Sequence, residues 1–127
     1  MQERWLIPLD FASVARTRHE FRKWLERCVG NDQPLTEYEL VFGELVTNAV
    51  RYGRAPINVE VECSEHRLKI RVEDWGGCFE IAKVRPVQPL AEGGRGLEIV
   101  KTLASNVTVD DGANHPCVVV ATMDMVA

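Results

Sequence analysis

The sequence predicts one two-layer α+β domain, and three observations lead to this fold class. The chain has 127 residues, the length of a single ordinary domain spanning residues 1–127. Apolar residues make up 46% of the chain and charged residues 27%, so it has enough apolar side chains to form a core. Segments with helical hydrophobic spacing are followed by paired segments in which apolar and polar residues alternate. Helices interspersed with hairpins, rather than with single strands, indicate a two-layer sandwich.

The first quarter of the chain predicts an edge strand and a helix. Residues 5–9, WLIPL, predict a short edge strand because Pro8 cannot donate a hydrogen bond to a neighbouring strand. Asp10 is a typical N-cap, and the apolar residues within 14–28 have helical spacing. Gly30 is placed to end this helix.

A second helix is predicted to begin at a capping box and to end at a glycine. Residues 36–39, TEYE, have the capping-box pattern, and Leu35 and Leu40 are spaced as a hydrophobic staple. The helix should then run to about Tyr52 and stop at Gly53.

The rest of the chain predicts two hairpins that flank a loop and a helix. Apolar and polar residues alternate over 57–63 and 68–72, which predicts a hairpin with its turn at residues 64–66. Residues 75–96 hold five of the nine glycines and predict a loop. A third helix and the strands of a last hairpin are predicted over residues 97–104, 107–109 and 118–123.

Composition and charge exclude several classes of protein. The net charge of −4 argues against a protein that coats nucleic acid. The apolar runs are far shorter than the ~20 residues that span a bilayer, and no secretory signal is recognised, so we expect a cytoplasmic protein away from membranes. No C-x-x-C pair is present, so we expect four reduced thiols rather than a zinc site or a disulfide framework. The cysteines are Cys28, Cys63, Cys78 and Cys117.

Five basic residues fall in the first predicted helix. They form either a solvated face or a docking surface for an acidic partner protein, and the sequence leaves both open. They are Arg16, Arg18, Arg22, Lys23 and Arg27.

Two polar residues lie one turn apart in the second predicted helix. Glu44 and Asn48 share a helix face with apolar residues, so this face should point inward. A buried carboxylate needs a compensating cation, water or partner. An oxygen-ligated Mg²⁺ would suit the amide, whereas a solvated helix edge would need no ligand.

Two further segments combine glycines with a charged residue. Asp74 has the same parity as the apolar residues of its predicted strand, so it should be buried, and Gly76 and Gly77 follow it. The alternative is that Asp74 only opens a turn. Residues 93–96, GGRG, directly precede a predicted helix. The free backbone N–H groups at the start of this helix could bind phosphate. The alternative is that the segment is an ordinary flexible loop.

In this order, the three segments resemble the N, G1 and G2 boxes of the GHKL ATPase superfamily. The resemblance covers residues 36–105 and implies a Bergerat-type fold, with a mixed, mostly antiparallel sheet, helices on one face and a short ATP lid. Within the superfamily the chain looks most like the small bacterial anti-sigma factor serine/threonine-protein kinases. It shares their size as a stand-alone domain and the motifs ELVTNAVR and GRGLEIV.

The resemblance implies a role for each matched residue. Asn48 would ligate the Mg²⁺ of bound ATP, and Glu44 would act as the general base. Asp74 would accept a hydrogen bond from the adenine amino group, in a pocket shaped by Gly76 and Gly77. The residues that would bring backbone or positive charge close to the phosphates are Arg51, Gly94, Arg95, Gly96 and Leu97.

The resemblance also implies partners. The chain would phosphorylate a serine of an anti-anti-sigma antagonist protein and alternately sequester a sigma factor, with no direct contact to nucleic acid; it leaves a homodimer open. Two alternatives remain: an ATP-binding regulatory module without phosphotransfer, and a detached histidine-kinase-like catalytic domain. An acid-stable phosphoserine product would favour the kinase, and an acid-labile phosphohistidine the last alternative.

The sequence departs from the family pattern in two places. Cys78 stands where such families often keep glycine or serine. Residues 115–118, HPCV, replace an expected Gly-x-Thr whose hydroxyl supports the adenine site.

Overall fold

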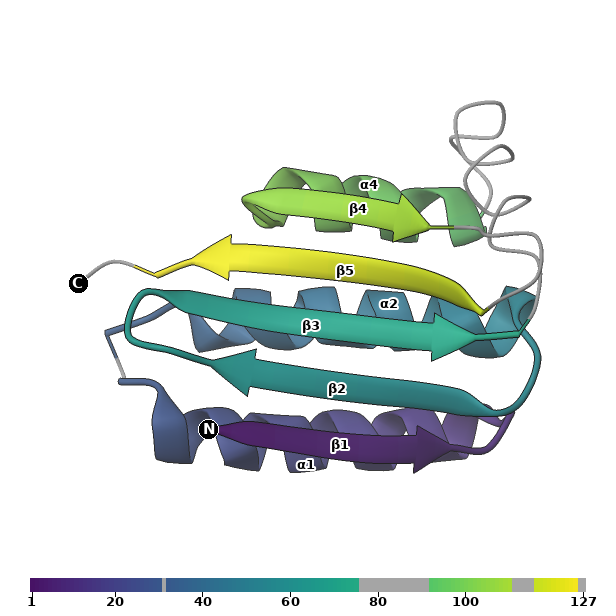
Figure 1. The fold of residues 1–127 in the computed structure, drawn as a ribbon, viewed down its shortest axis with the longest axis horizontal. Coiled ribbons are helices and arrows are strands. Elements are labelled where there is room, and N and C mark those ends of the chain that lie inside the picture. The colour runs from purple at the N-terminus through teal and green to yellow at the C-terminus, as the bar shows by residue number, and fades with distance from the viewer. Residues whose placement is uncertain (31, 76–91, 111–115, 126–127) are drawn as a thin grey trace.

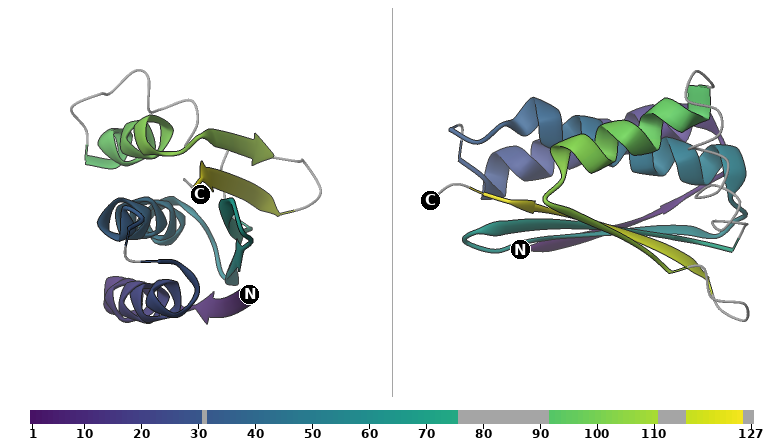
Figure 2. Two further views of the ribbon diagram at one scale, coloured as in Figure 1. Left: turned by 90° about the vertical axis from the view of Figure 1, so that its left-hand side faces the viewer. Right: turned by 90° about the horizontal axis from the view of Figure 1, so that it is seen from above.

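The computed structural model describes residues 1–30, 32–75, 92–110 and 116–125, and of residues 92–97 the backbone alone. In these parts of the chain, five strands form one sheet and three helices cover one of its faces (Figures 1 and 2). The elements are β1 (Gln2–Ile7), α1 (Phe11–Cys28), α2 (Leu35–Tyr52), β2 (Ile57–Cys63), β3 (Arg67–Asp74), α4 (Glu92–Leu103), β4 (Asn106–Asp110) and β5 (Cys117–Asp124).

The sheet has the order β1-β2-β3-β5-β4, and β1 is an edge strand as predicted. Every strand pairing in the described part of the chain is antiparallel, so the expectation of a mixed sheet is wrong for these five strands. The reason lies in the last hairpin. The strand that follows α4 does not pair with β3 but lies outside β5, which occupies the position between β3 and β4.

The boundaries of the first two helices confirm some predicted caps and correct others. The side chain of Asp10 accepts a hydrogen bond of 2.7 Å from the backbone N–H of Ser13, as expected of an N-cap. The second helix ends at Tyr52, with Gly53 as its C-cap. Its predicted capping box is wrong, because the helix already begins at Leu35 and its cap residue, Pro34, makes no side-chain hydrogen bond.

The third helix begins earlier than predicted. The spacing placed its start at Leu97, but α4 begins at Glu92 and includes the three glycines of GGRG. Glycine disfavours a helix by roughly 1 kcal/mol relative to alanine, so the sequence alone argues for a loop here. Tertiary packing overrides this preference, since α4 packs along α2 on the same face of the sheet (Figure 2).

The core lies between the helices and the sheet. Phe21 of α1 and Phe42 of α2 stack with ring centroids 4.1 Å apart, and the edge of Trp5 from β1 meets Phe42 at 5.7 Å. Alternate residues of β2 and β3 complete this layer. These strand residues are Ile57, Val59, Val61, Leu68, Ile70 and Val72, none more than 2% exposed.

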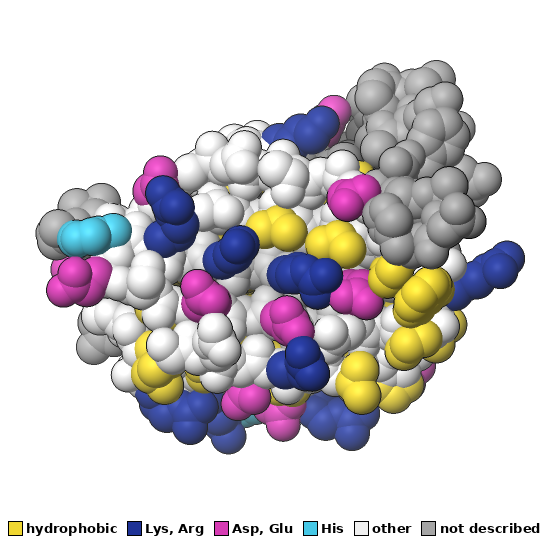
Figure 3. All heavy atoms as spheres, in the orientation of Figure 1, with side chains coloured by type: hydrophobic (Ala, Val, Ile, Leu, Met, Phe, Trp, Pro, Cys, Tyr) yellow, Lys and Arg dark blue, Asp and Glu magenta, His cyan; other side chains and the backbone are white. Residues whose placement is uncertain are grey.

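The opposite face of the sheet is open and carries interspersed charges (Figure 3). Arg4 of β1 donates from Nε to Glu60 of β2 at 3.1 Å, and Arg71 of β3 lies 3.6 Å from the same carboxylate. On the helical side, part of the basic face of α1 is also paired. Arg22 contacts Glu39 of α2 at 3.0 Å, which ties the two helices together.

The cysteines correct one expectation. Cys28 and Cys63 are free thiols, as predicted, but Cys117 is disulfide-bonded. Whether a cysteine forms a disulfide depends on which residues the fold brings close together, and chain spacing does not show it. No helix in the described part of the chain is long and apolar enough to cross a bilayer.

Candidate functional site

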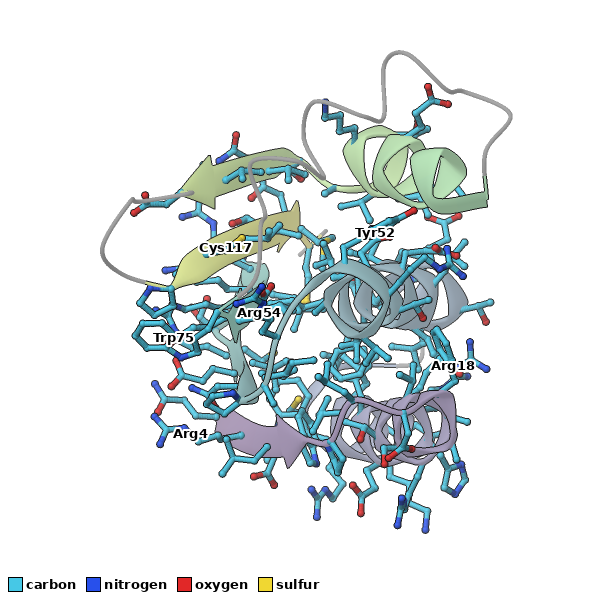
Figure 4. All side chains as sticks on the ribbon, turned by 90° about the vertical axis from the view of Figure 1, so that its right-hand side faces the viewer. Arg4, Arg18, Tyr52, Arg54, Trp75 and Cys117 are labelled. Atoms are coloured by element: carbon cyan, nitrogen blue, oxygen red, sulfur yellow. The ribbon has the colours of Figure 1, made fainter. Side chains whose placement is uncertain are left out.

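The sequence-predicted polar residues gather where α2 and β3 end and α4 begins. All three of these ends lie at the right-hand edge of the molecule in Figure 1, and Figure 4 looks onto that edge. This edge is termed the α2/β3 edge below. It brings together the last two turns of α2, the last residue of β3 and the first turn of α4.

Asp74 is buried at the end of β3. Buried and less buried residues alternate along this strand, and Asp74 follows Leu68, Ile70 and Val72 on the face covered by helices. The carboxyl-bearing residue is only 3% exposed. The prediction that alternation carries this carboxyl to the inner face is therefore confirmed.

Gly53 allows Asp74 to sit directly against the end of α2. A Cβ placed on Gly53 would lie 2.6 Å from Cγ and Oδ1 of Asp74 and 2.5 Å from the carbonyl oxygen of Ala49. Both distances are shorter than any real Cβ contact, so no other residue fits without moving the carboxyl or the helix. From the sequence, Gly53 is predicted only to end the helix. A glycine at the C-terminus of a helix gives no sign of which residue packs beside it.

Asn48 and Glu44 lie one turn apart in α2 and differ in burial. Asn48 is 6% exposed, whereas Glu44 is half-buried and reaches solvent. Their i, i+4 spacing places both side chains on one helix face. The amide is thus held inside and the carboxylate stands at the border between protein and solvent, where a second reactant can approach.

The positively charged candidates have separate positions. Arg51 is half-buried in the last turn of α2, with its guanidinium carbon 5.9 Å from the ring centroid of Phe11. It lies three residues after Asn48, on the same side of the helix. Arg95 belongs to the first turn of α4, and its side chain is outside the described part of the structure.

The first turn of α4 replaces the predicted phosphate-binding loop. The backbone of Gly94, Arg95, Gly96 and Leu97 is helical, not extended ahead of a helix. The first four N–H groups of any α-helix lack an intrahelical partner, so Gly93 and Gly94 still present donors at a positive dipole end, whereas Gly96 lies one turn inside the helix. Their lack of side chains leaves that backbone open to close approach.

Three predicted features fall outside the described residues. These are Gly76 and Gly77, the predicted loop over residues 76–91 together with the short lid, and the departure at Cys78.

The second departure lies beside the site. Cys117, within the HPCV segment, pairs directly with Asp74 on the neighbouring strand and is 2% exposed. A disulfide-bonded cysteine therefore lies in register with Asp74.

This edge also carries an exposed aromatic residue that the sequence patterns do not predict. Trp75 is 51% exposed, and its backbone N–H donates to the carbonyl of Arg54 at 3.1 Å. Tyr52, at the end of α2, is 38% exposed, and Figure 4 shows both side chains at the α2/β3 edge. Single exposed aromatics carry no signal in a sequence, because burial depends on the whole fold.

The arrangement is suited to binding a ligand that has a planar polar group and negative charge. A buried carboxylate accepts hydrogen bonds, a buried amide offers an oxygen, and helix N–H groups attract anions. Among the described residues, no group of three or more His, Cys, Asp and Glu is placed to hold a metal ion.

The comparison with protein families decides what kind of domain this is. The profile of the histidine kinase-like ATPase domain matches residues 7–122. The chain belongs to this family.

Other comparisons show how far this histidine kinase-like ATPase domain resembles known proteins. The solved structure of Acinetobacter baumannii histidine kinase AdeS is similar with a TM-score of 0.58 and 18% identity. The similarity covers 98% of this chain and 68% of that chain, and at this identity it shows the fold alone. A search of curated proteins gave no match. The predicted GHKL-type α+β fold is thereby confirmed.

Proposed function

We propose that the chain is an anti-sigma factor with ATP-dependent serine/threonine-protein kinase activity, which binds Mg-ATP at the α2/β3 edge. The observation that carries the nucleotide part is the joint burial of Asp74 and Asn48 where α4 presents its first turn. Both side chains have partners within the protein, but a carboxylate has about four lone-pair sites and an amide oxygen two, so Asp74 can also accept from an adenine amino group and Asn48 can also ligate a metal ion.

The fit of Mg²⁺ and ATP rests on the chemistry of these donors. Mg²⁺ favours oxygen ligands and often takes only one or two from the protein, with the rest from phosphates and water. The amide oxygen of Asn48 would supply that protein ligand, and the bound ion would neutralise charge on the phosphates. The N–H groups at the start of α4 would hold the phosphate oxygens, with Arg51 and Arg95 as candidate counter-charges.

Glu44 supports phosphoryl transfer rather than nucleotide binding alone. Its carboxylate is half-exposed and one turn from Asn48, so a serine hydroxyl could approach it from solvent. Glu44 would accept the hydroxyl proton as the serine oxygen bonds to the γ-phosphorus and the bond to the leaving β-phosphate oxygen breaks. The products are phosphoserine and ADP.

The partners proposed are an anti-anti-sigma antagonist that carries the serine and a sigma factor that is held when the antagonist is phosphorylated. The support is the likeness of the motifs ELVTNAVR and GRGLEIV to small anti-sigma kinases. On this proposal the acceptor serine is on another chain, and transfer switches which partner the domain binds.

The experiment uses the purified chain as bait in a lysate of its source cells, followed by radiolabelled Mg-ATP. Wild type and Glu44→Gln are run in parallel, since the amide keeps the size of the carboxylate but cannot take a proton. The proposal predicts a small captured protein that carries acid-stable phosphoserine only with wild type. Capture without label would indicate an ATP-gated binding module, and acid-labile phosphohistidine a detached histidine-kinase-like catalytic domain.

A further inference from the structure

Two free thiols meet at the end of the sheet opposite to Asp74. Cys28 is the last residue of α1, and Cys63 is the last residue of β2, 35 positions later. The Sγ of Cys63 donates to the backbone carbonyl of Cys28 at 3.7 Å. The fold thus brings together two cysteines that are far apart in the chain.

The thiol pair lines a cavity that small molecules can enter. The cavity has a volume of about 320 Å³, and both cysteines are half-buried rather than sealed in the core. Besides Cys28 and Cys63, it is lined by Met1, Val29, Gly30, Gln33, Ser64, Glu65 and Met125. A thiol that borders such a space can react with a dissolved reagent, whereas a fully buried thiol is inert.

We propose that Cys28 and Cys63 form a reversible intramolecular disulfide and are a thiol modification site that takes low-molecular-weight disulfides of the glutathione class as oxidant. The position of the Cys63 sulfur against the backbone of Cys28, beside a cavity that both residues line, carries the inference, because disulfide formation requires two cysteines whose backbones already lie close together. The site is separate from the proposed nucleotide site and does not depend on it.

The order of reaction at the two sulfurs follows from their surroundings. Burial, together with the charge and hydrogen bond of neighbouring Cys63, raises the pKa of the Cys28 thiol to about 12, so Cys28 stays protonated near neutral pH. Cys63 is therefore the first nucleophile. Its thiolate attacks one sulfur of the oxidant, RSSR, forming a mixed disulfide and releasing RS⁻.

The second step closes the bond within the protein. The thiol of Cys28 gives its proton to a thiolate such as the released RS⁻ and attacks the Cys63 sulfur of the mixed disulfide, releasing the second R group as a thiolate. In sum, two protein thiols are oxidised to one disulfide and RSSR is reduced to two RSH. An excess of a small dithiol reverses the exchange.

The disulfide would close a loop that contains the whole of α2. Cys28 precedes Leu35 and Cys63 follows Tyr52, so α2 lies within the loop. The cross-link would join the end of α1 covalently to the end of β2. Restricting the unfolded chain in this way predicts a rise in Tm of about 10–15 °C for a loop of this length.

The test treats the reduced full chain with oxidised glutathione and maps tryptic peptides without reduction. Cleavage after Arg27, Arg51, Arg54 and Arg67 places Cys28 and Cys63 in separate peptides, 28–51 and 55–67. The proposal predicts that these two peptides become cross-linked and that a dithiol releases them. Parallel thermal unfolding should show the higher Tm in the oxidised sample.

Single serine variants test the order of attack. Cys28→Ser should accumulate a glutathione mixed disulfide on Cys63, because the resolving thiol is missing. Cys63→Ser should leave Cys28 largely unmodified, because burial, the largest cause of its raised pKa, remains in this variant. Serine is close in size to cysteine, so circular dichroism is expected to match wild type in both variants.

Three results would overturn the proposal. One is wild type that shows no link between peptides 28–51 and 55–67 under oxidant. Another is stable glutathione adducts on both cysteines with no cross-link. The third is a reduced chain that binds one equivalent of Cd²⁺ with both thiols, so that neither thiol then reacts, and that forms no disulfide with the oxidant. This result would make the pair a site for a soft metal ion.

Discussion

The backbone of Gly53 passes so close to the buried carboxyl of Asp74 that a methyl group on Gly53 would lie 2.6 Å from its Oδ1 atom. This contact joins the end of α2 to the end of β3 and fixes where the carboxyl stands. It also makes Gly53 a positioning residue for the proposed adenine site, although Gly53 has no side chain to touch a ligand.

Gly53→Ala is expected to weaken Mg-ATP binding and to lower stability by about 1–3 kcal/mol, because the added methyl group must displace Asp74 or the last turn of α2. Isothermal titration calorimetry and urea unfolding measure the two effects. Gly30→Ala is a matched control, since its methyl group would lie 2.5 Å from Oδ1 of Asp32, an exposed side chain that can rotate away. Equal ATP affinity in wild type and Gly53→Ala would remove this positioning role.

Asn48→Ala is expected to abolish the Mg²⁺-dependent part of ATP affinity, a loss of about tenfold or more, because the metal would lose its protein ligand. The comparison is of Kd for ATP with Mg²⁺ and with a chelator, in wild type and variant. Asn106→Ala makes the same change at the start of β4, at the opposite end of the sheet from Asp74, and should bind ATP like wild type. If Mg²⁺ strengthens ATP binding equally in Asn48→Ala and wild type, Asn48 does not hold the metal.

Glu44→Gln is expected to slow phosphoryl transfer by roughly 10²–10⁴-fold while nucleotide affinity stays within a few-fold of wild type, since a general base acts only in the transfer step. Single-turnover transfer to the captured partner measures the rate. Glu37→Gln, on the exposed first turn of α2, is the matched control. Transfer at the wild-type rate in Glu44→Gln would assign the base elsewhere.

The lowered pKa of Glu60 predicts a pH dependence of the free energy of unfolding that does not involve the candidate nucleotide site. The hydrogen bond from Arg4 lowers the pKa of Glu60 below its ordinary value of 4.5. The folded state thus favours the ionised carboxylate, and this stabilisation is complete above pH 4.5 and disappears as the pH falls through the lowered pKa.

Glu60→Gln should therefore be less stable than wild type at neutral pH, by less than about 1 kcal/mol because the pair is partly exposed. The difference should shrink as the pH is lowered below 4.5, and urea unfolding at several pH values measures it. A difference that grows toward acid pH would contradict the assignment.

Local patterns predicted much of the fold and of the candidate site. The burial of Asp74 follows from strict alternation along β3, because successive side chains of a strand point to opposite faces. The shared face of Glu44 and Asn48 follows from helical spacing in the same way. Such features can be predicted because they depend only on residues that are close together in the chain.

The features that sequence analysis missed depend on residues distant in the chain. The start of α4 at Glu92 is favoured by packing on α2, against the preference of three glycines. The contact of Gly53 with Asp74 and the pairing of Asp74 with Cys117 each need the finished sheet. Propensity and periodicity carry no information about such approaches.

The most direct test of the proposed nucleotide site is calorimetric titration of wild type, Asp74→Asn and Glu73→Gln with Mg-ATP. Glu73 precedes Asp74 on the same strand, but its carboxylate pairs with Arg71 at 2.8 Å instead of facing the helices. We predict that wild type and Glu73→Gln bind with similar Kd, and that Asp74→Asn, folded by circular dichroism, binds at least about tenfold more weakly. Equal affinity in Asp74→Asn and wild type, or no binding by wild type, would contradict an adenine site at the α2/β3 edge.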